Sequence, residues 1–191
     1  MTNLQDSLTK LGACEEALEW VADQSLATAW ATCERGDWML WILGRLVGPP
    51  NSKSRRRLVG TAADCAALAL PIFERQYHGD KSMRECVQTC RRYAHGQANL
   101  TEVRKARYAV SCVKTAHANT TISAAAATIS AAAAAIADAA ISAADAAYHA
   151  AAAYADAATS DADAARKSTL KICADIVRGN YPSAPEIGLG E

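Results

Sequence analysis

The sequence predicts an all-α protein, a compact multi-helix bundle with close-packed alanine-rich helices. Three observations lead to this prediction. No segment alternates apolar and polar residues with β-branched enrichment over the length of a strand. Proline is scarce, with five residues in a chain of 191. The segment 122–158 is dominated by alanine, the strongest helix former, and contains neither glycine nor proline.

Residues 1–48 are expected to form a Trp-rich N-terminal helical subdomain. A first helix is expected over 11–23, where apolar residues follow helical spacing. Ser25 is expected to cap a helix over 26–34, and Asp37 a helix that ends at the glycine before two prolines. All four tryptophans lie in this unit, and Trp38 and Trp41 stand three residues apart. Such a cluster is typical of a core or a docking surface, although it could also be a binding platform.

Residues 49–180 are expected to form an alanine-rich helical bundle, followed by an irregular tail over 181–191. Pro71 should kink or split the first helix of this unit near Leu70. Ser82 with Glu85 predicts a capping box for a helix that ends at Gly96. Thr101 is expected to cap the next helix. The last helix is expected over 161–178, with acidic residues at its start and basic ones towards its end, as the helix dipole favours.

The alanine-rich segment is expected to form one or two tightly packed helices rather than a disordered spacer, a membrane span or a fibre. A disordered spacer would be rich in Gly, Ser and Pro, and the polar residues within the segment argue against a membrane span. Large residues recur at intervals of seven, with one shift in phase between Ile136 and Ile141, and alanines follow four residues after the first three. The seam consists of Ile122, Ile129, Ile136, Ile141 and Tyr148 with Ala126, Ala133 and Ala140. Such a seam lets helices approach closely and favours self-association, so a homodimer is expected.

Composition excludes several classes of function. The formal net charge is zero, which implies no general attraction to nucleic acid or to a membrane surface. The N-terminus lacks the pattern of a signal peptide, and the seven cysteines contain no C-x-x-C pair. We therefore expect reduced, buried cysteines in a cytoplasmic protein. Cys86 and Cys90 share one helix face, but no second pair of ligands stands nearby, so neither a metal nor a cofactor is expected.

Two sets of side chains are candidates for binding. The first is basic, with tyrosines as stacking partners: Arg55, Arg56, Arg57, Arg91, Arg92, Arg104, Lys105 and Arg107, with Tyr93 and Tyr108. It could bind a phosphate-bearing ligand, an RNA or an acidic protein partner, or form a solvated face. The second set lies in the alanine-rich segment: Asp145, Tyr148, His149 and Tyr154. Asp145 and His149, four residues apart, could hydrogen-bond and line a pocket or a dispersed active site, or simply lie on a helix surface.

No P-loop, GxGxxG or zinc-finger pattern is present, so no motif specifies a reaction. The segments "CAALALPIFERQYHGDKSMRECVQTCRRYAHGQ", "EVRKARYAVSCVKTAHA" and "AAYHAAAAYADAA" nevertheless resemble an alanine-rich all-α "putative immunity protein" family of bacterial toxin loci, with relatives in phage genomes. Many of these relatives also begin with a Trp-rich lead similar to "LGACEEALEW…AWATCERGDWMLWILGRL". The resemblance covers residues from about 8 to 180. It implies a helical protein without enzymatic activity that neutralises its target by binding, and it supplies no set of binding residues.

The leading hypothesis is therefore a non-enzymatic binding protein that neutralises a toxin or an immune effector, in a bacterium or as a phage counter-defence inhibitor. The alternative is a helical sponge that sequesters a nucleotide-type immune signalling molecule through an Arg-lined pocket. Convergence of Arg91, Arg92, Arg104 and Arg107 on one concave pocket would favour the sponge. Their spread over a convex face would favour a protein inhibitor.

Overall fold

The computed structural model of the chain describes residues 4–116, 127, 131–132, 134–135, 139–158 and 161–187. Every regular element within these ranges is a helix, which confirms the predicted all-α class. No helix in the described part of the chain is both long enough and apolar enough to cross a membrane.

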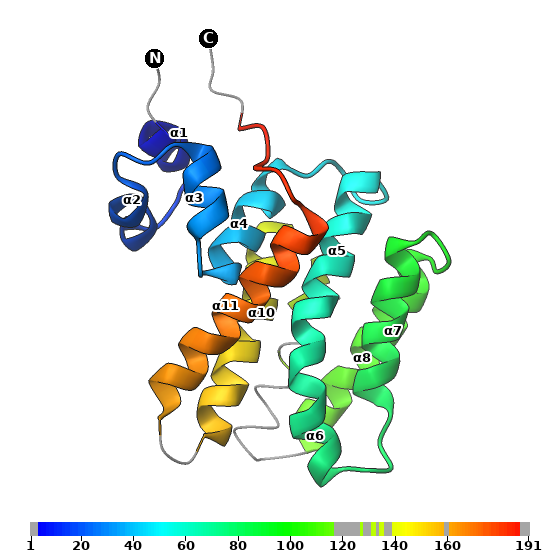
Figure 1. Cartoon of the computed structure of the whole chain (residues 1–191). Helices are drawn as coiled ribbons and strands as arrows, with labels where there is room; N and C mark the ends of the chain where they lie inside the picture. Colours follow the sequence, from blue (N-terminus) through cyan, green and yellow to red (C-terminus); the bar gives the residue numbers. More distant parts are fainter. Residues whose placement is uncertain are drawn as a thin grey trace.

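A central helix, α10 (Ala139–Ala157), organises the bundle. It packs against α4 (Gly36–Leu46), α5 (Lys53–Ala66) and α11 (Ala162–Asn180). On the far side of α5, α7 (Ser82–Ala94) and α8 (Leu100–Ala116) form a hairpin in which α7 contacts α5 and α8 contacts α7 (Figure 1). The hairpin therefore forms one edge of the molecule.

The buried side of α10 consists of alanines. Those with 0% exposure are Ala143, Ala146, Ala147, Ala150, Ala151 and Ala153. Their small side chains let three helices approach α10 together, which confirms the predicted close packing. The seam prediction is wrong for Tyr148, which is 44% exposed, because a tyrosine does not fit between helices that alanines hold this close. The other large residues of that seam and their alanines lie outside the residues whose side chains the structure describes.

Three short helices precede α4: α1 (Leu4–Leu11), α2 (Glu15–Val21) and α3 (Leu26–Thr32). The single helix expected over 11–23 is not formed, because Gly12 adopts a left-handed φ of 84° and ends the first helix. Ser25 caps α3 as predicted, accepting a hydrogen bond from the Thr28 N–H at 3.1 Å. Asp37 is not the cap of α4. It lies in the first turn, where Arg35 Nε and Nη2 donate to its carboxylate at 3.0 and 2.8 Å.

The second unit divides where the sequence predicts. A 3₁₀ turn, η1 (Ala67–Ala69), separates α5 from α6 (Leu70–Gln76), and Pro71 lies in the first turn of α6, where its missing N–H leaves no hydrogen bond unmade. The α7 helix ends before Gly96, which has a left-handed φ of 75°. The α11 helix begins after Asp161, whose carboxylate accepts from the Ala164 N–H at 2.9 Å.

The helix starts of the α7–α8 hairpin differ from the prediction. Ser82 and Glu85 form no capping box, because the Asp80 carboxylate accepts the Ser82 N–H at 2.8 Å instead. A capping box opens α8: Asn99 Oδ1 accepts the Glu102 N–H at 3.0 Å, and Glu102 Oε2 accepts the Asn99 N–H at 2.8 Å. Thr101 lies inside the first turn of α8 and is not its cap.

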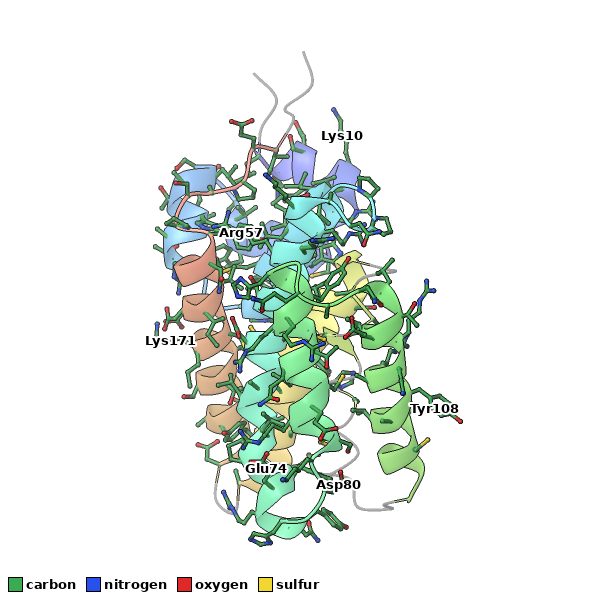
Figure 2. All side chains as sticks on the ribbon, turned by 90° about the vertical axis from the view of Figure 1, so that its right-hand side faces the viewer. Lys10, Arg57, Glu74, Asp80, Tyr108 and Lys171 are labelled. Atoms are coloured by element: carbon green, nitrogen blue, oxygen red, sulfur yellow. The ribbon has the colours of Figure 1, made fainter. Side chains whose placement is uncertain are left out.

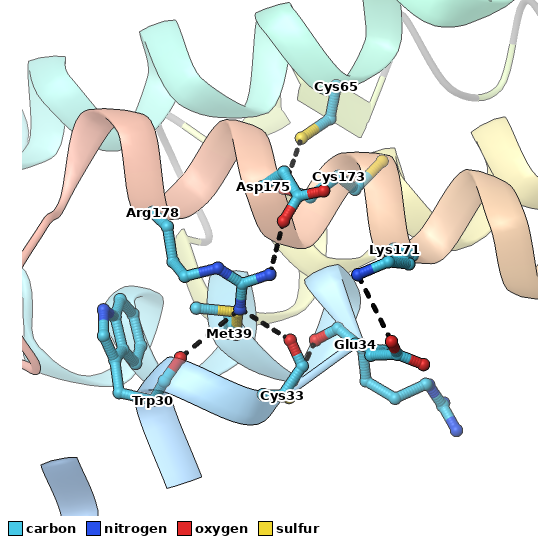
Figure 3. Close-up of polar contacts among 10 residues, drawn as sticks. Trp30, Cys33, Glu34, Met39, Cys65, Lys171, Cys173, Asp175 and Arg178 are labelled. Carbon is cyan, nitrogen blue, oxygen red and sulfur yellow. Dashed lines mark hydrogen bonds and ion pairs between the residues drawn. The ribbon is translucent and has the colours of Figure 1, made fainter. Parts of the chain in front are cut away.

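One arginine connects the segment before α4 to α11. Nη1 of Arg178 donates to the carbonyl oxygens of Cys33 at 2.7 Å and Trp30 at 3.4 Å, and Nη2 contacts Asp175 Oδ1 at 2.6 Å (Figure 3). The indole Nε1 of Trp30 donates to the Tyr181 carbonyl oxygen at 3.0 Å. The end of α3 is thus held against the C-terminal part of the chain.

Candidate binding surfaces

The three consecutive arginines at the start of α5 point to three different places. Arg55 is buried, and its Nε and Nη1 donate to the carbonyl oxygens of Gly48 at 3.1 Å and Ala135 at 3.2 Å. Arg57 donates to the Asn180 carbonyl oxygen and lies 4.3 Å from the ring centroid of Tyr181. Both side chains therefore connect parts of the same chain. Only Arg56 reaches a groove, which is described below.

The two arginines on α7 are engaged by carboxylates of different helices. Arg91 Nε lies 2.8 Å from Asp64 Oδ1 on α5, whereas Arg92 Nη2 lies 2.6 Å from Glu102 Oε1 on α8. All four side chains are substantially exposed, so each ion pair contributes only about 0–1 kcal/mol to stability. Their charges are nevertheless compensated within the chain.

The outer face of α8 carries basic residues around an exposed aromatic ring. Tyr108 is 73% exposed, and Arg104 and Lys105 are exposed on the preceding turn. Figure 2 shows the Tyr108 side chain projecting away from the bundle. Val103 and Val110, which are 1% and 0% exposed, bury the opposite face of the helix. Arg107 is also exposed beside this surface. We call Arg104, Lys105 and Tyr108 the α8 face.

The polar set on α10 does not form an acid–base pair. Asp145, His149 and Tyr154 are half-buried, and no hydrogen bond joins Asp145 to His149 among the contacts of these described residues. The Tyr148 ring meets the His149 ring edge-on, with centroids 5.6 Å apart, and the Arg166 guanidinium lies 5.4 Å from the Tyr148 centroid. These contacts join α10 to α11 and supply no proton relay.

The tryptophans enclose a small apolar cavity of about 70 Å³ beneath α1, α2 and α3. Trp38 and Trp41 line it, and both also line a neighbouring cavity of about 200 Å³ that reaches Ala144 of α10. Trp38 lies 6.1 Å from Trp20 between ring centroids, with the Arg35 guanidinium 4.2 Å above its ring. Both cavities are smaller than the roughly 300–1,000 Å³ of typical small-molecule sites, which favours a core over a nucleotide site.

Buried thiols offer no reactive centre. Burial raises the pKa of Cys33, which lines the apolar cavity. The neighbouring Cys173 thiol and burial raise the pKa of Cys65, and Cys86 and burial do the same for the pKa of Cys90. These groups stay protonated at neutral pH and are poor nucleophiles. No group of three or more His, Cys, Asp or Glu residues in the described part of the chain is placed to hold a metal ion.

A polar groove of about 560 Å³ lies where the start of α5 meets the turn between α7 and α8. Its lining residues come from both places: Asn51, Arg56, Gly96, Gln97, Ala98, Asn99 and Glu102. Sequence reasoning singled out only Arg56 in this set. Glu102 lies in the first turn of α8 and the others are turn residues, for which the one local signal is a glycine at the end of a helix followed by short polar side chains.

The family model for an "Imm-5 like putative immunity protein" matches residues 49–175, which is more than half of the chain. The chain belongs to this Imm-5 like family. No curated protein and no solved structure matches it. Both the α8 face and the polar groove lie within the region that the Imm-5 like family model covers, whereas the Trp-rich segment precedes that region.

Proposed function

We propose that this protein neutralises a toxin by binding it, without catalysing a reaction, and that the α8 face is the centre of the binding surface. Membership of the Imm-5 like immunity family supports an immunity-type function. The observation that carries the choice of surface is Tyr108, which is 73% exposed with two basic side chains beside it.

An exposed tyrosine beside arginine matches the chemistry of binding hot spots. Tyr and Arg are enriched among the residues whose truncation costs a complex most. The α8 face is also held rigidly, because Val103 and Val110 fix the helix on α7. A rigid surface loses little conformational entropy on binding.

The charge of the surface indicates the chemistry of the partner. Arg104 and Lys105 are both basic, and Glu102, one turn away, is engaged by Arg92. The α8 face therefore complements an acidic surface on the toxin. Such complementarity speeds association and makes it sensitive to salt.

The placement of the arginines supports a protein inhibitor over a nucleotide sponge. Arg91 and Arg92 pair with carboxylates on two different helices, and Arg104 and Arg107 are exposed on α8. None of these four residues lines the groove or the Trp-lined cavities. We also propose that the protein acts in the cytoplasm, either as a bacterial immunity protein or as a phage-encoded inhibitor. Its seven free cysteines support a reducing compartment.

The homodimer stays a prediction. Six alanines of α10 are fully buried against helices of the same chain, so a second copy would have to dock on other residues.

The test is protection of cells that express the toxin encoded beside the gene, together with the affinity of the purified pair. Tyr108→Ala should weaken the complex by about 30-fold or more, the effect of losing a hot spot of at least 2 kcal/mol. Arg104→Glu with Lys105→Glu should slow association and reverse its dependence on salt, because salt then screens a repulsion.

Matched controls lie on other helices. Tyr148→Ala removes an exposed tyrosine from α10, and Arg45→Glu reverses an exposed charge on α4. Both should leave protection unchanged. Full protection by the variant that combines Tyr108→Ala, Arg104→Glu and Lys105→Glu would contradict this choice of surface. Covalent modification of the toxin by the purified protein would contradict the non-enzymatic mode.

A further inference from the structure

We propose that the polar groove binds an oxyanion, a carboxylate or a phosphate group, through the guanidinium of Arg56. This site does not rest on toxin binding by the α8 face. Its basis is the charge and burial of Arg56 and the residues around its guanidinium.

Arg56 is a half-buried cation that pairs with no carboxylate among the residues that the structure describes. Its neighbours Arg91 and Arg92 each have such a partner, whereas the buried Nε of Arg56 meets no hydrogen-bond acceptor in that part of the chain. The ring of Tyr93, whose centroid lies 5.4 Å from the guanidinium carbon, compensates the charge only in part. A partly desolvated cation in this state gains stability from an anion placed against its accessible nitrogens.

The guanidinium is held in place before any ligand arrives. Tyr93 is fully buried, and its hydroxyl donates to Asn51 Oδ1 at 3.2 Å, which fixes the ring under Arg56. A Cβ on Gly96 would lie 2.9 Å from Arg56 Nη1, and Gly96 has a φ of 75°. Glycine at this position therefore makes room for the guanidinium, which is preorganised against the groove.

The walls of the groove are rich in donors. The side-chain oxygens of Asn51 and Asn99 already accept hydrogen bonds, from Tyr93 and from the Glu102 N–H, so the amide nitrogens of both are left to donate. Glu102 is the one acid among the described lining residues, and Arg92 and the Asn99 N–H already engage its carboxylate at 2.6 and 2.8 Å. One uncompensated positive charge and several amide donors thus face a space of about 560 Å³, which admits a phosphate or an acidic side chain.

The test follows backbone amides and the Arg56 Nε–Hε group by NMR during titration with inorganic phosphate and, separately, with acetate, at an ionic strength held constant with chloride. We expect saturable shifts at the Gly96 and Gln97 amides and at Arg56. Arg56→Gln should weaken phosphate binding about tenfold or more, as expected for a charge-assisted hydrogen bond. The phosphate affinity of Arg56→Lys should lie between those of the wild type and Arg56→Gln, since lysine keeps the charge and loses the planar fork.

The matched control is Arg45→Gln, which removes an exposed arginine of α4 outside the groove and should leave phosphate binding unchanged. Saturation by phosphate alone identifies a phosphate-bearing ligand, and saturation by both anions identifies the carboxylate of an acidic group as a ligand too. Shifts that rise linearly, or equally at all arginines, would show charge screening and overturn the site. If Arg56→Gln disturbs the fold, unchanged affinity in both Arg56→Lys and Gln97→Ala overturns it. Neither outcome bears on the α8 variants, which are read out against the toxin.

Discussion

Replacing Arg178 by methionine should separate the Trp-rich segment from the bundle. The arginine is 22% exposed and donates to two carbonyl oxygens at the end of α3 (Figure 3). Those carbonyls have no partner within their own helix, because the last carbonyls of any helix lack one. Methionine keeps the apolar stem of the side chain and removes the donors, so the loss reports the polar contacts.

The magnitude follows from the polar contacts of Arg178, of which the 3.8 Å contact to Met39 Sδ is weak. The 2.7 Å hydrogen bond to the Cys33 oxygen involves a charged donor and contributes about 1.5–3 kcal/mol, while the 3.4 Å contact to Trp30 adds little. Asp175 is 59% exposed, so its ion pair adds about 0–1 kcal/mol. Arg178→Met should therefore lower the free energy of unfolding by about 2–4 kcal/mol, and Asp175→Asn by no more than about 1 kcal/mol.

The assay is urea unfolding followed by tryptophan fluorescence and by far-UV circular dichroism. Trp20 and Trp30 lie in α2 and α3, and Trp38 of α4 contacts Trp20, so fluorescence reports on the segment that Arg178 holds and on its contact with α4. In the wild type the two signals should give one midpoint. In Arg178→Met the fluorescence midpoint should fall by about 1–2 M urea, given a slope of roughly 2 kcal/mol per molar, and precede the midpoint from circular dichroism.

Equal free energies of unfolding for Arg178→Met and Asp175→Asn would refute the reasoning. That result would mean that the carbonyl contacts add nothing beyond an exposed ion pair. The α3 segment would then be held by apolar packing and by the Trp30 indole alone.

Two further predictions concern packing and pH. Gly36→Ala places a Cβ 2.5 Å from the Cys173 Cβ and 2.6 Å from the Ala174 nitrogen, so it should lower the free energy of unfolding in urea by about 2–3 kcal/mol. The control Gly179→Ala places a Cβ with nothing within 4 Å and should be neutral or stabilising. Equal effects of the two substitutions would contradict the close approach of α4 to α11. Burial raises the pKa of Tyr181 to about 12, partly opposed by Arg57, from about 10 in the unfolded chain. Because this pKa is raised, its contribution is complete below pH 10 and is lost as the pH rises from about 10 to 12. Because Tyr181 is only half-buried, that loss is about 1–2 kcal/mol, and it should be absent in Tyr181→Phe; identical alkaline losses in both proteins would contradict it.

The sequence predicted those features that depend on neighbouring residues. Pro71 splits α5 from α6, and Ser25 and Asp161 cap their helices, because each effect needs only backbone groups a few residues away. The predicted capping box at Ser82 is not formed, because the Asp80 carboxylate accepts the same backbone N–H. A capping box that was not predicted is present at Asn99. Local motifs identify a helix start within a few residues, and the three-dimensional competition among nearby acceptors decides the cap.

The candidate site was harder to predict for a geometric reason. Successive residues on a helix point about 100° apart, so Arg55, Arg56 and Arg57 cannot converge on one ligand. A cluster of charges in sequence therefore became three separate contacts. Conversely, Asn51 and Gly96 are far apart in sequence and meet only because α7 packs on α5.

The alanine helix explains why both candidate surfaces involve the α7–α8 hairpin and not α10. The inner side of α10 contributes only methyl groups, which hold α4, α5 and α11 close together and bind nothing. Long polar side chains are excluded from such a packed centre, because alanines leave no room for them. They gather instead where α7 and α8 stand off the bundle, and the ion pair of Arg92 with Glu102 ties the two hairpin helices to each other there. A rigid alanine-packed body thus presents one edge on which charged and aromatic groups are both ordered and accessible.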